Sequence, residues 1–402
     1  MDLNLKKIRD DFPSLAKKNK GKDPLYFDSA CMSLRPKSVI LAMNEYYEVH
    51  PSCHNRTIHA YGEMTTEKYE KARRSIATFL NSPSEKNIIF TKNTTESINM
   101  VAKGIGLEKG DCILTSNIEH NSNFLPWQFS SHNEYTKHLC FSVDQKGNFS
   151  FEEYENFLKE NPVKLVSVFM TSHILGTTLP IKKMVEIAHR YNALFLLDAA
   201  QSVAHEKIDV MSMDVDFMAF SFHKAYGPTG VGCLYGKTDL LEKMTPLYYG
   251  GETVVDVNMD TCVVAPLPQR LEAGLQNYAG VLGAAEALNY LKNIGLEKIK
   301  NHESSLKLYL YEKMQKIARV HILGDHTGTL LNFYVEGIDS GELSIMLSKT
   351  RNIMLRSGVH CAHSWYHEEE LPATLRVSLG VYNTKEEVDT FLETLENFIR
   401  FY

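Results

Sequence analysis

Lys224 carries the strongest chemical signal in the sequence. It follows the apolar stretch 216–220 and precedes the segment Gly-Pro-Thr-Gly at 227–230. Burial lowers the pKa of an amine and makes it nucleophilic, so a lysine in this place can form a Schiff base with an aldehyde cofactor. The glycines let the backbone pass close to a flat ring, and Ser221 and His223 can reach a phosphate. A solvated loop lysine is the alternative, so the interpretation depends on further residues.

Asp198 ends the apolar run 194–197. Such a run predicts a parallel strand buried on both faces, and ligands of open α/β sheets bind beyond the carboxyl ends of the strands. A carboxylate there can pair with a pyridinium nitrogen and keep the ring protonated, which makes the ring an electron sink. The alternative is that Asp198 caps the next helix.

Two further strand ends carry polar groups. Residues 87–90 predict a strand, and Thr94 and Thr95 then begin an amphipathic helix whose free N–H groups and dipole favour an anion such as phosphate. His120 follows the predicted strand 112–116 and can lie on a ring and exchange protons with a substrate. An ordinary helix cap and an ordinary hydrogen-bonded histidine are the alternatives.

Three motifs in this order resemble a known group of enzymes. They are Glu-His-x-x-Asn at 119–123, Asp-x-x-Gln at 198–201 and Ser-x-His-Lys at 221–224. The set is similar to the class V aminotransferase group of fold-type I pyridoxal-phosphate enzymes, and specifically to the cysteine desulfurase and selenocysteine lyase family. The likeness extends from about residue 26 to about residue 388, which is nearly the whole chain.

The resemblance assigns roles around pyridoxal 5'-phosphate. It makes Lys224 the Schiff-base lysine and Asp198 the partner of the pyridinium nitrogen. It makes Gln201 a ligand of the ring hydroxyl and His120 the residue that stacks on the ring. The phosphate ligands that it implies are Thr94, Thr95, Ser221 and His223.

The resemblance assigns the sulfur chemistry to Cys361. This cysteine stands among Arg356, His360 and His363, groups that favour a thiolate. A free buried cysteine is the alternative. The loop resembles the compact type of the family, and its short tether limits reach, so we expect a sulfur-accepting protein to dock at the mouth of the site. The other cysteines are expected to be structural: Cys112 and Cys233 in strands, Cys31 and Cys140 in apolar stretches, and Cys53 and Cys262 in loops.

Two arginines and a histidine are candidate substrate ligands. Arg376 lies in the predicted strand 375–379, and a planar guanidinium matches a carboxylate bidentately. We expect Arg376 to bind the substrate carboxylate and Arg356 to hold the substrate or the Cys361 loop. His59 lies in a segment that resembles one entering the active site in the family.

Two positions depart from the family pattern. His173 replaces an asparagine beside the cofactor hydroxyl, and it could donate the same hydrogen bond or titrate. Tyr278 replaces a threonine that commonly reaches the phosphate from the second subunit. Because the segment 274–278 resembles the one that crosses the dimer interface, we expect a two-fold symmetric homodimer.

The elements expected around these residues form an α/β fold. Strand-like runs such as 165–170 alternate with helical patterns such as 181–188, which predicts βαβ units and a mainly parallel sheet. The resemblance implies the fold-type I architecture, in which a large domain with a mainly parallel seven-stranded sheet is joined to a smaller α+β domain. We expect residues 19–285 to form the large domain and residues 1–18 and 286–402 to form the small one.

Composition excludes several function classes. The 402 residues are 44% hydrophobic and carry a net charge of -6, with both signs interspersed, which leaves no basic field for nucleic acid or for a membrane surface. The N-terminus lacks the apolar core of a signal peptide, and no run is long enough to span a bilayer. Seven cysteines without framework spacing suggest a reducing compartment, so we expect a cytoplasmic protein with no metal site.

The predicted function is pyridoxal-phosphate-dependent removal of sulfur from L-cysteine. The products would be L-alanine and a persulfide on Cys361, whose sulfur would serve iron-sulfur cluster assembly or thio-modification. Selenocysteine lyase activity is an alternative, as is another reaction of the class V group: transamination, an epimerase-like reaction or kynureninase-like hydrolysis. A non-enzymatic scaffold is a further alternative.

Overall fold

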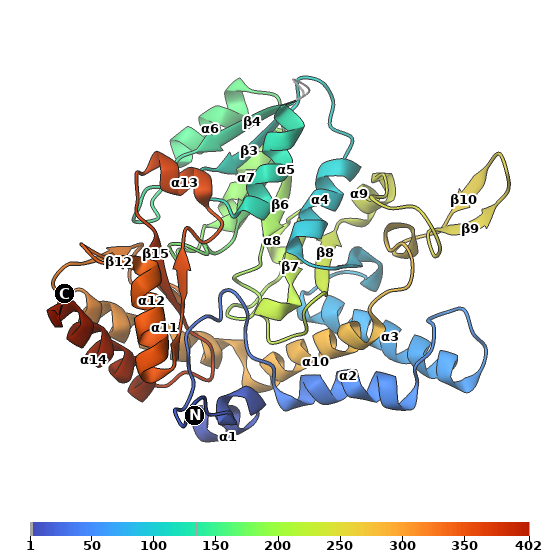
Figure 1. Ribbon diagram of the computed structural model, residues 1–402. Coiled ribbons are helices and arrows are strands. Elements are labelled where there is room, and N and C mark those ends of the chain that lie inside the picture. The colour runs from blue at the N-terminus through green and yellow to red at the C-terminus, as the bar shows by residue number, and fades with distance from the viewer. Residues whose placement is uncertain (1–2, 133–135, 402) are drawn as a thin grey trace.

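A seven-stranded sheet forms the centre of the molecule in this computed structural model, which describes residues 3–132 and 136–401 (Figure 1). The strand order is β2-β8-β7-β6-β5-β3-β4, and only β8 runs antiparallel to its neighbours. The strands are β2 (Ile88–Thr91), β3 (Cys112–Ser116), β4 (Lys137–Phe141), β5 (Val163–Phe169), β6 (Leu194–Asp198), β7 (Phe217–Ser221) and β8 (Gly232–Gly236). The predicted mainly parallel sheet is confirmed.

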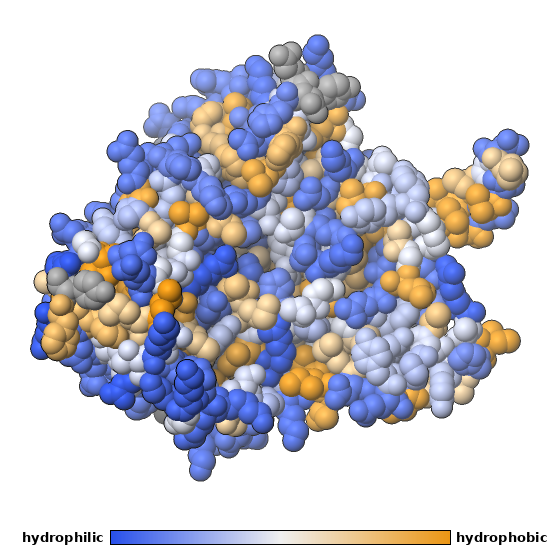
Figure 2. Space-filling view, in the orientation of Figure 1, coloured by the Kyte–Doolittle hydropathy of each residue, from blue (hydrophilic) through white to orange (hydrophobic). Residues whose placement is uncertain are grey.

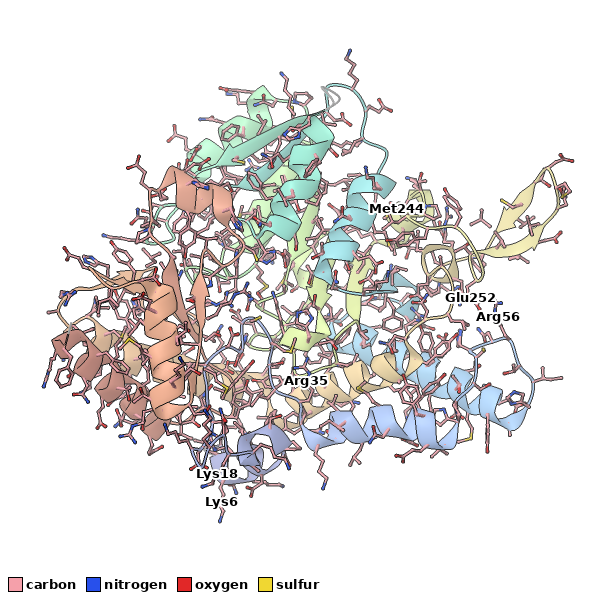
Figure 3. The ribbon with its side chains drawn as sticks, viewed as in Figure 1. Lys6, Lys18, Arg35, Arg56, Met244 and Glu252 are labelled. Atoms are coloured by element: carbon pink, nitrogen blue, oxygen red, sulfur yellow. The ribbon has the colours of Figure 1, made fainter. Side chains whose placement is uncertain are left out.

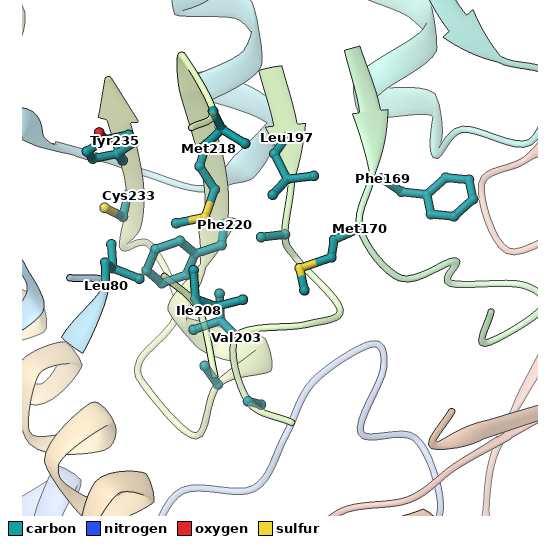
Figure 4. Packing of buried hydrophobic residues seen from close by; sticks show 14 of the residues in the cluster. Leu80, Phe169, Met170, Leu197, Val203, Ile208, Met218, Phe220, Cys233 and Tyr235 are labelled. Carbon is teal, nitrogen blue, oxygen red and sulfur yellow. The ribbon is translucent and has the colours of Figure 1, made fainter. Parts of the chain in front are cut away.

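Both faces of this sheet are covered, which explains why its strands read as continuous apolar runs. In β7, Met218 and Phe220 pack into one hydrophobic cluster, part of which Figure 4 shows, whereas Phe217 and Ala219 pack into another. The helices that follow or flank the sheet strands are α4 (Thr94–Gly104), α5 (Asn121–Ser131), α6 (Phe151–Glu160), α7 (Ile181–Arg190), α8 (Val210–Met213) and α9 (Thr238–Lys243).

Below the sheet in the view of Figure 1, helix α10 (Tyr278–Ile294) packs against both α2 (Lys37–Val49) and α3 (Ala60–Phe79). The short helix α1 (Leu5–Asp10) lies near them. Helix α10 leads directly into α11 (Leu296–Met314), and the chain there passes to the C-terminal part of the molecule.

The C-terminal part is built on a four-stranded antiparallel sheet of order β11-β12-β15-β14. Its strands are β11 (Val320–Leu323), β12 (Leu330–Val335), β14 (Arg356–Gly358) and β15 (Thr374–Ser378), and its helices besides α11 are α12 (Ser340–Arg351), α13 (His363–Glu368) and α14 (Lys385–Phe401). Strand β1 (Leu25–Tyr26) pairs with β13 (Ile353–Met354), so this early segment lies with the C-terminal part. The predicted α+β architecture of that part is confirmed, while the domain boundaries stay a prediction.

A β-hairpin formed by β9 (Val254–Val257) and β10 (Cys262–Val264) projects from the body of the molecule (Figure 1). Cys262 therefore lies in a strand, and its expected place in a loop was wrong. Val255, Val257 and Met259 are exposed, and Figure 2 shows hydrophobic surface along this projection. At its base Arg56 and Glu252 point toward each other and form an ion pair (Figure 3).

No helix within residues 3–132 and 136–401 combines the length and the apolar character needed to cross a membrane.

Candidate active site

A cavity of about 230 Å³ lies at the carboxyl ends of β5, β6 and β7, where the large sheet meets β14 and β15. The structure brings every residue predicted to bind the cofactor to the wall of this cavity. They are Thr94, Thr95, His120, His173, Asp198, Gln201, Ser221, His223 and Lys224. The two predicted substrate arginines, Arg356 and Arg376, also line it.

Lys224 reaches the cavity because β7 ends in a tight 3-10 turn, Phe222–Lys224. The backbone N–H groups of Ala225 and Gly227 both donate to the carbonyl of Phe222, each at 2.8 Å. A side chain at Gly227 would meet Phe222 Cβ at 2.8 Å, so the turn requires glycine there. Burial lowers the pKa of Lys224, while Asp198 acts in the opposite direction. The lowered pKa favours the neutral amine, which suits nucleophilic and proton-transfer chemistry.

Asp198 lies at the end of β6 and is buried. Its Oδ1 accepts a hydrogen bond from the Ala200 N–H at 2.9 Å, so the carboxylate does hold the following turn. Burial raises the pKa of Asp198, against the effects of this hydrogen bond and of Lys224. Its second oxygen has no hydrogen-bond partner among the described residues and is open to a cationic ligand in the cavity.

The start of α4 and the end of β7 bring hydroxyl and N–H groups together at the cavity. Ser221 Oγ accepts a hydrogen bond from the Thr94 N–H at 2.7 Å and lies 2.7 Å from Thr94 Oγ1. Thr95 Oγ1 lies 2.7 Å from Ser122 Oγ, and no described residue accepts from the Thr95 N–H. Since α4 has 11 residues and its N-terminus points at the cavity, dipole and donors together favour an anion there.

His120 is held in one tautomer by the start of α5. Its Nδ1 accepts a hydrogen bond from the Ser122 N–H at 3.0 Å, so the neutral ring carries its proton on Nε2. Burial, followed by the charges of Lys224, Arg376 and Arg356, lowers the pKa of His120 to about 3. The ring therefore stays neutral at any physiological pH.

His173 lies beside His120, with 4.9 Å between the ring centres. It is 3% exposed, and its Nε2 has no hydrogen-bond partner in the described part of the chain. Burial, with the neighbouring His120, places the pKa of His173 well below its usual value. Of the two expected roles, the neutral hydrogen-bonding one suits this environment and titration does not.

Arg356 and Arg376 are directly opposite each other on the antiparallel strands β14 and β15. Arg376 is 2% exposed; its Nη1 donates to the His173 carbonyl at 3.0 Å, and its Nη2 lies 3.7 Å from Asp28 Oδ1. Its Nε and Nη2 have no hydrogen-bond partners among the described residues. Like charges across a strand pair repel, so a bound carboxylate would both neutralise the pair and satisfy these donors.

Cys361 lies in the loop between β14 and α13, next to the cavity wall. Its Sγ is 3.8 Å from Arg356 Nη2, and its carbonyl accepts from the Asn121 N–H at 2.7 Å. The backbone is in the left-handed region at His360 (φ 47°) and at Cys361 (φ 64°). Such strain at two successive residues other than glycine is typical of functional loops.

His360, next to Cys361, does not supply the positive charge expected of it. His360 Nε2 lies 3.0 Å from Thr374 Oγ1, and burial, with the arginine charges, lowers the pKa of His360, so its ring is neutral. His363 Nδ1 lies 3.0 Å from Asn121 Nδ2. The cation that lies against the Cys361 sulfur is the Arg356 guanidinium.

His59 and Tyr278 lie apart from the cavity in this protomer. His59 is exposed and caps α3, where its Nδ1 accepts from the Gly62 N–H at 3.3 Å. Tyr278 is buried in an aromatic cluster, with its ring centre 5.3 Å from that of Tyr69. Neither side chain lines the cavity of its own protomer, and the substrate-binding role expected of His59 stays a prediction.

Cys31 is a cavity residue that the sequence analysis missed. It was expected to be structural, but it lines the cavity and its Sγ accepts a hydrogen bond from Arg356 Nη1 at 3.3 Å. The available signal was its position directly after the segment 26–30, which carries the start of the family resemblance.

Comparison with known proteins agrees with this arrangement. The model of the family "Aminotransferase class-V" matches residues 25–391. The cysteine desulfurase of Synechococcus elongatus is 37% identical over 393 residues, which are 96% of this chain and 62% of that protein. The chain thus spans less than two thirds of that relative. A probable cysteine desulfurase of Halalkalibacterium halodurans is 36% identical, with 98% of both chains covered.

Solved structures show the same relationship at the level of the fold. The apo cysteine desulfurase of Thermococcus onnurineus NA1 superposes with a TM-score of 0.94 at 34% identity, covering 100% of this chain and 99% of that one. The cysteine desulfurase CsdA of Escherichia coli superposes with a TM-score of 0.90 at 31% identity, with 100% of both chains covered. The chain therefore belongs to the aminotransferase class-V family and, within it, to the cysteine desulfurases.

Proposed function

We propose that this enzyme removes sulfur from L-cysteine with pyridoxal phosphate as its cofactor, giving L-alanine and a persulfide on Cys361. The observation that carries the proposal is the grouping of side chains at one cavity. Lys224, Asp198 and Arg376 line it, and the Cys361 sulfur lies against the guanidinium of Arg356, which also lines it. The first three groups suit amino-acid chemistry in general, whereas the thiol is needed only for sulfur transfer.

Several polar groups of the cavity fit the polar groups of pyridoxal phosphate. The N–H of Thr95 and the hydroxyl groups beside it suit the phosphate, and the free oxygen of Asp198 suits the ring nitrogen. His173 Nε2 and the side chain of Gln201 suit the ring hydroxyl. Pyridoxal phosphate, when bound, withdraws electrons from the Cα of an attached amino acid.

The residues of the chain would divide the remaining work. Arg376 binds the substrate carboxylate, and Lys224 Nζ, with its lowered pKa, takes the proton from Cα. The Cys361 thiolate, held by Arg356, attacks the substrate sulfur. The bond between that sulfur and the substrate carbon breaks, and the carbon skeleton leaves as alanine after protonation. His120 is the proposed proton shuttle.

The test is to incubate the cofactor-loaded protein with L-cysteine and a dithiol reductant and to measure alanine and sulfide together. Equal amounts of the two products are expected. A keto acid in place of alanine would instead indicate transamination, and no turnover would support a scaffold. Cys140→Ser, which alters a β4 thiol outside the cavity, is a control expected to match wild type. Comparing rates with L-selenocysteine decides between desulfurase and lyase specificity.

We also propose a two-fold symmetric homodimer and a cytoplasmic location. The projecting hairpin exposes Val255, Val257 and Met259, a surface that suits a second copy of the chain. The described cysteines are all free, as in a reducing compartment. The short Cys361 loop favours a protein acceptor that docks at the site mouth, in iron-sulfur cluster assembly or thio-modification.

A further inference from the structure

Two cysteine thiols contact the same guanidinium group, that of Arg356, at the edge of the cavity. Arg356 Nη1 donates to the Cys31 sulfur at 3.3 Å, and Arg356 Nη2 lies 3.8 Å from the Cys361 sulfur. Both cysteines are partly exposed, and Cys31 lines the cavity itself. A guanidinium that faces two sulfur atoms can stabilise a thiolate on either of them.

The surroundings of Cys31 supply a base and a further cation. The Cys31 backbone N–H donates to the Asp28 carbonyl at 3.1 Å, and burial raises the pKa of the Asp28 carboxylate, against the charges of Arg376 and Arg356, which makes this carboxylate a better proton acceptor. Arg376 lines the same cavity with Nε and Nη2 unpaired, although the residue is only 2% exposed. These free donors are the ones proposed to bind the substrate carboxylate, so Arg356 is the cation that remains in contact with the two sulfur atoms.

A role of Cys31 in sulfur transfer rests on the proposed function, because it needs a persulfide on Cys361. We propose that Cys31 is a second sulfur-accepting residue, which takes the outer sulfur atom of the Cys361 persulfide. The Cys31 thiolate forms a bond to that outer sulfur, and the bond between the outer sulfur and Cys361 Sγ breaks. Cys361 leaves as a thiolate beside Arg356, and the proton of Cys31 passes to Asp28. The step exchanges one sulfur–sulfur bond for another and needs no oxidant or reductant.

The transfer frees Cys361 for another substrate while the first sulfur atom is still bound. Each protomer then carries a transferred sulfur atom on each of two cysteines, and the one on Cys31 stays inside the cavity. The consequence can be measured without a reductant, because each alanine released then reports one sulfur atom retained by the protein.

The experiment mixes the loaded enzyme with excess L-cysteine in the absence of reductant and measures the initial burst of alanine. About two alanine molecules per protomer are expected from wild type and about one from Cys31→Ser. Trapping followed by peptide mass analysis should find one added sulfur on the Cys31 peptide and one on the Cys361 peptide. Cys140→Ser, a matched and partly exposed thiol outside the cavity, should behave as wild type.

Wild-type protein with sulfur on Cys361 alone would overturn the inference, and this mapping does not depend on how well Cys31→Ser folds. Sulfur on the Cys31 peptide of Cys361→Ser would also overturn it, because Cys31 would then take sulfur without the relay. Failure of the proposed function has a different signature, since no alanine would appear from any of the proteins.

Discussion

The arginine pair Arg356 and Arg376 is the residue-scale feature on which the proposed binding of substrate depends. Arg356 and Arg376 repel each other across β14 and β15, and burial lowers the pKa of Arg376, although Asp28 offsets part of this effect. The repulsion between the two guanidinium groups is unfavourable until an anion enters the cavity. The pairing of β14 with β15, which places the two arginines opposite each other, therefore favours the binding of a carboxylate.

Arg376→Lys should weaken the use of L-cysteine, because lysine keeps the charge but loses the bidentate fork. We expect kcat/KM to fall about 10- to 100-fold, mainly through KM, which corresponds to the loss of one charge-assisted hydrogen bond. Steady-state kinetics with L-cysteine measure this. Arg319→Lys, at an exposed arginine that contacts the Glu336 carbonyl, is the matched control. An unchanged kcat/KM in Arg376→Lys would show that the carboxylate binds elsewhere.

At the scale of elements, the strands that end at the cavity could be predicted from sequence and the contacts between distant segments could not. The apolar runs of β5, β6 and β7 indicate strands buried on both faces, and their ends locate Asp198 and Lys224. Cys31 was missed because its partner Arg356 is 325 residues away. The projecting hairpin was missed because its exposed strands leave no apolar pattern facing a core.

A buried ion pair ties α11 to the segment that follows β6. His205 Nδ1 lies 2.6 Å from Glu303 Oε2, and Tyr226, near Lys224, also contacts Glu303, at 3.5 Å. Burial acts to lower the pKa of His205, but the charge of Glu303, its hydrogen bond and the charge of Glu206 together outweigh burial, so the pKa is raised. This stabilisation is fully present below the unfolded-state pKa of about 6.5 and is lost as the pH rises through the raised pKa of the folded state.

Glu303→Gln should therefore destabilise the protein more at about pH 6 than at about pH 9, with a loss of about 3 kcal/mol at the lower pH. Urea unfolding at the two pH values measures the difference. Glu396→Gln, on the more exposed part of α14, should show no such dependence. A pH-independent effect of Glu303→Gln would mean that His205 is neutral in the folded protein.

At the scale of the whole molecule, the hairpin of β9 and β10 carries exposed hydrophobic side chains. Val255 and Val257 are 69% and 65% exposed on one strand, and alternate residues of a strand share a face. The hairpin stands clear of its own protomer in Figure 1, held at its base by the pair Arg56–Glu252. A second copy of the chain would bury this face.

Val257→Asp should weaken the proposed homodimer by about tenfold or more in Kd, because a charge would replace a buried aliphatic side chain. Light scattering across a dilution series measures the change. Met211→Asp, at an exposed methionine of α8, is the control and should leave the dimer intact. Wild-type protein that is monomeric and fully active would contradict the proposal.

The most direct test of the central claim compares Cys361→Ala with wild type after both are loaded with pyridoxal phosphate. The variant keeps Lys224, Asp198 and Arg376, so adding L-cysteine should still change the absorption spectrum of the cofactor. Release of alanine and sulfide should fall by at least about 100-fold, because the variant lacks the thiol that is proposed to attack the substrate sulfur. Lys224→Ala should lose turnover as well. Cys361→Ala that releases alanine and sulfide as fast as wild type would contradict the account.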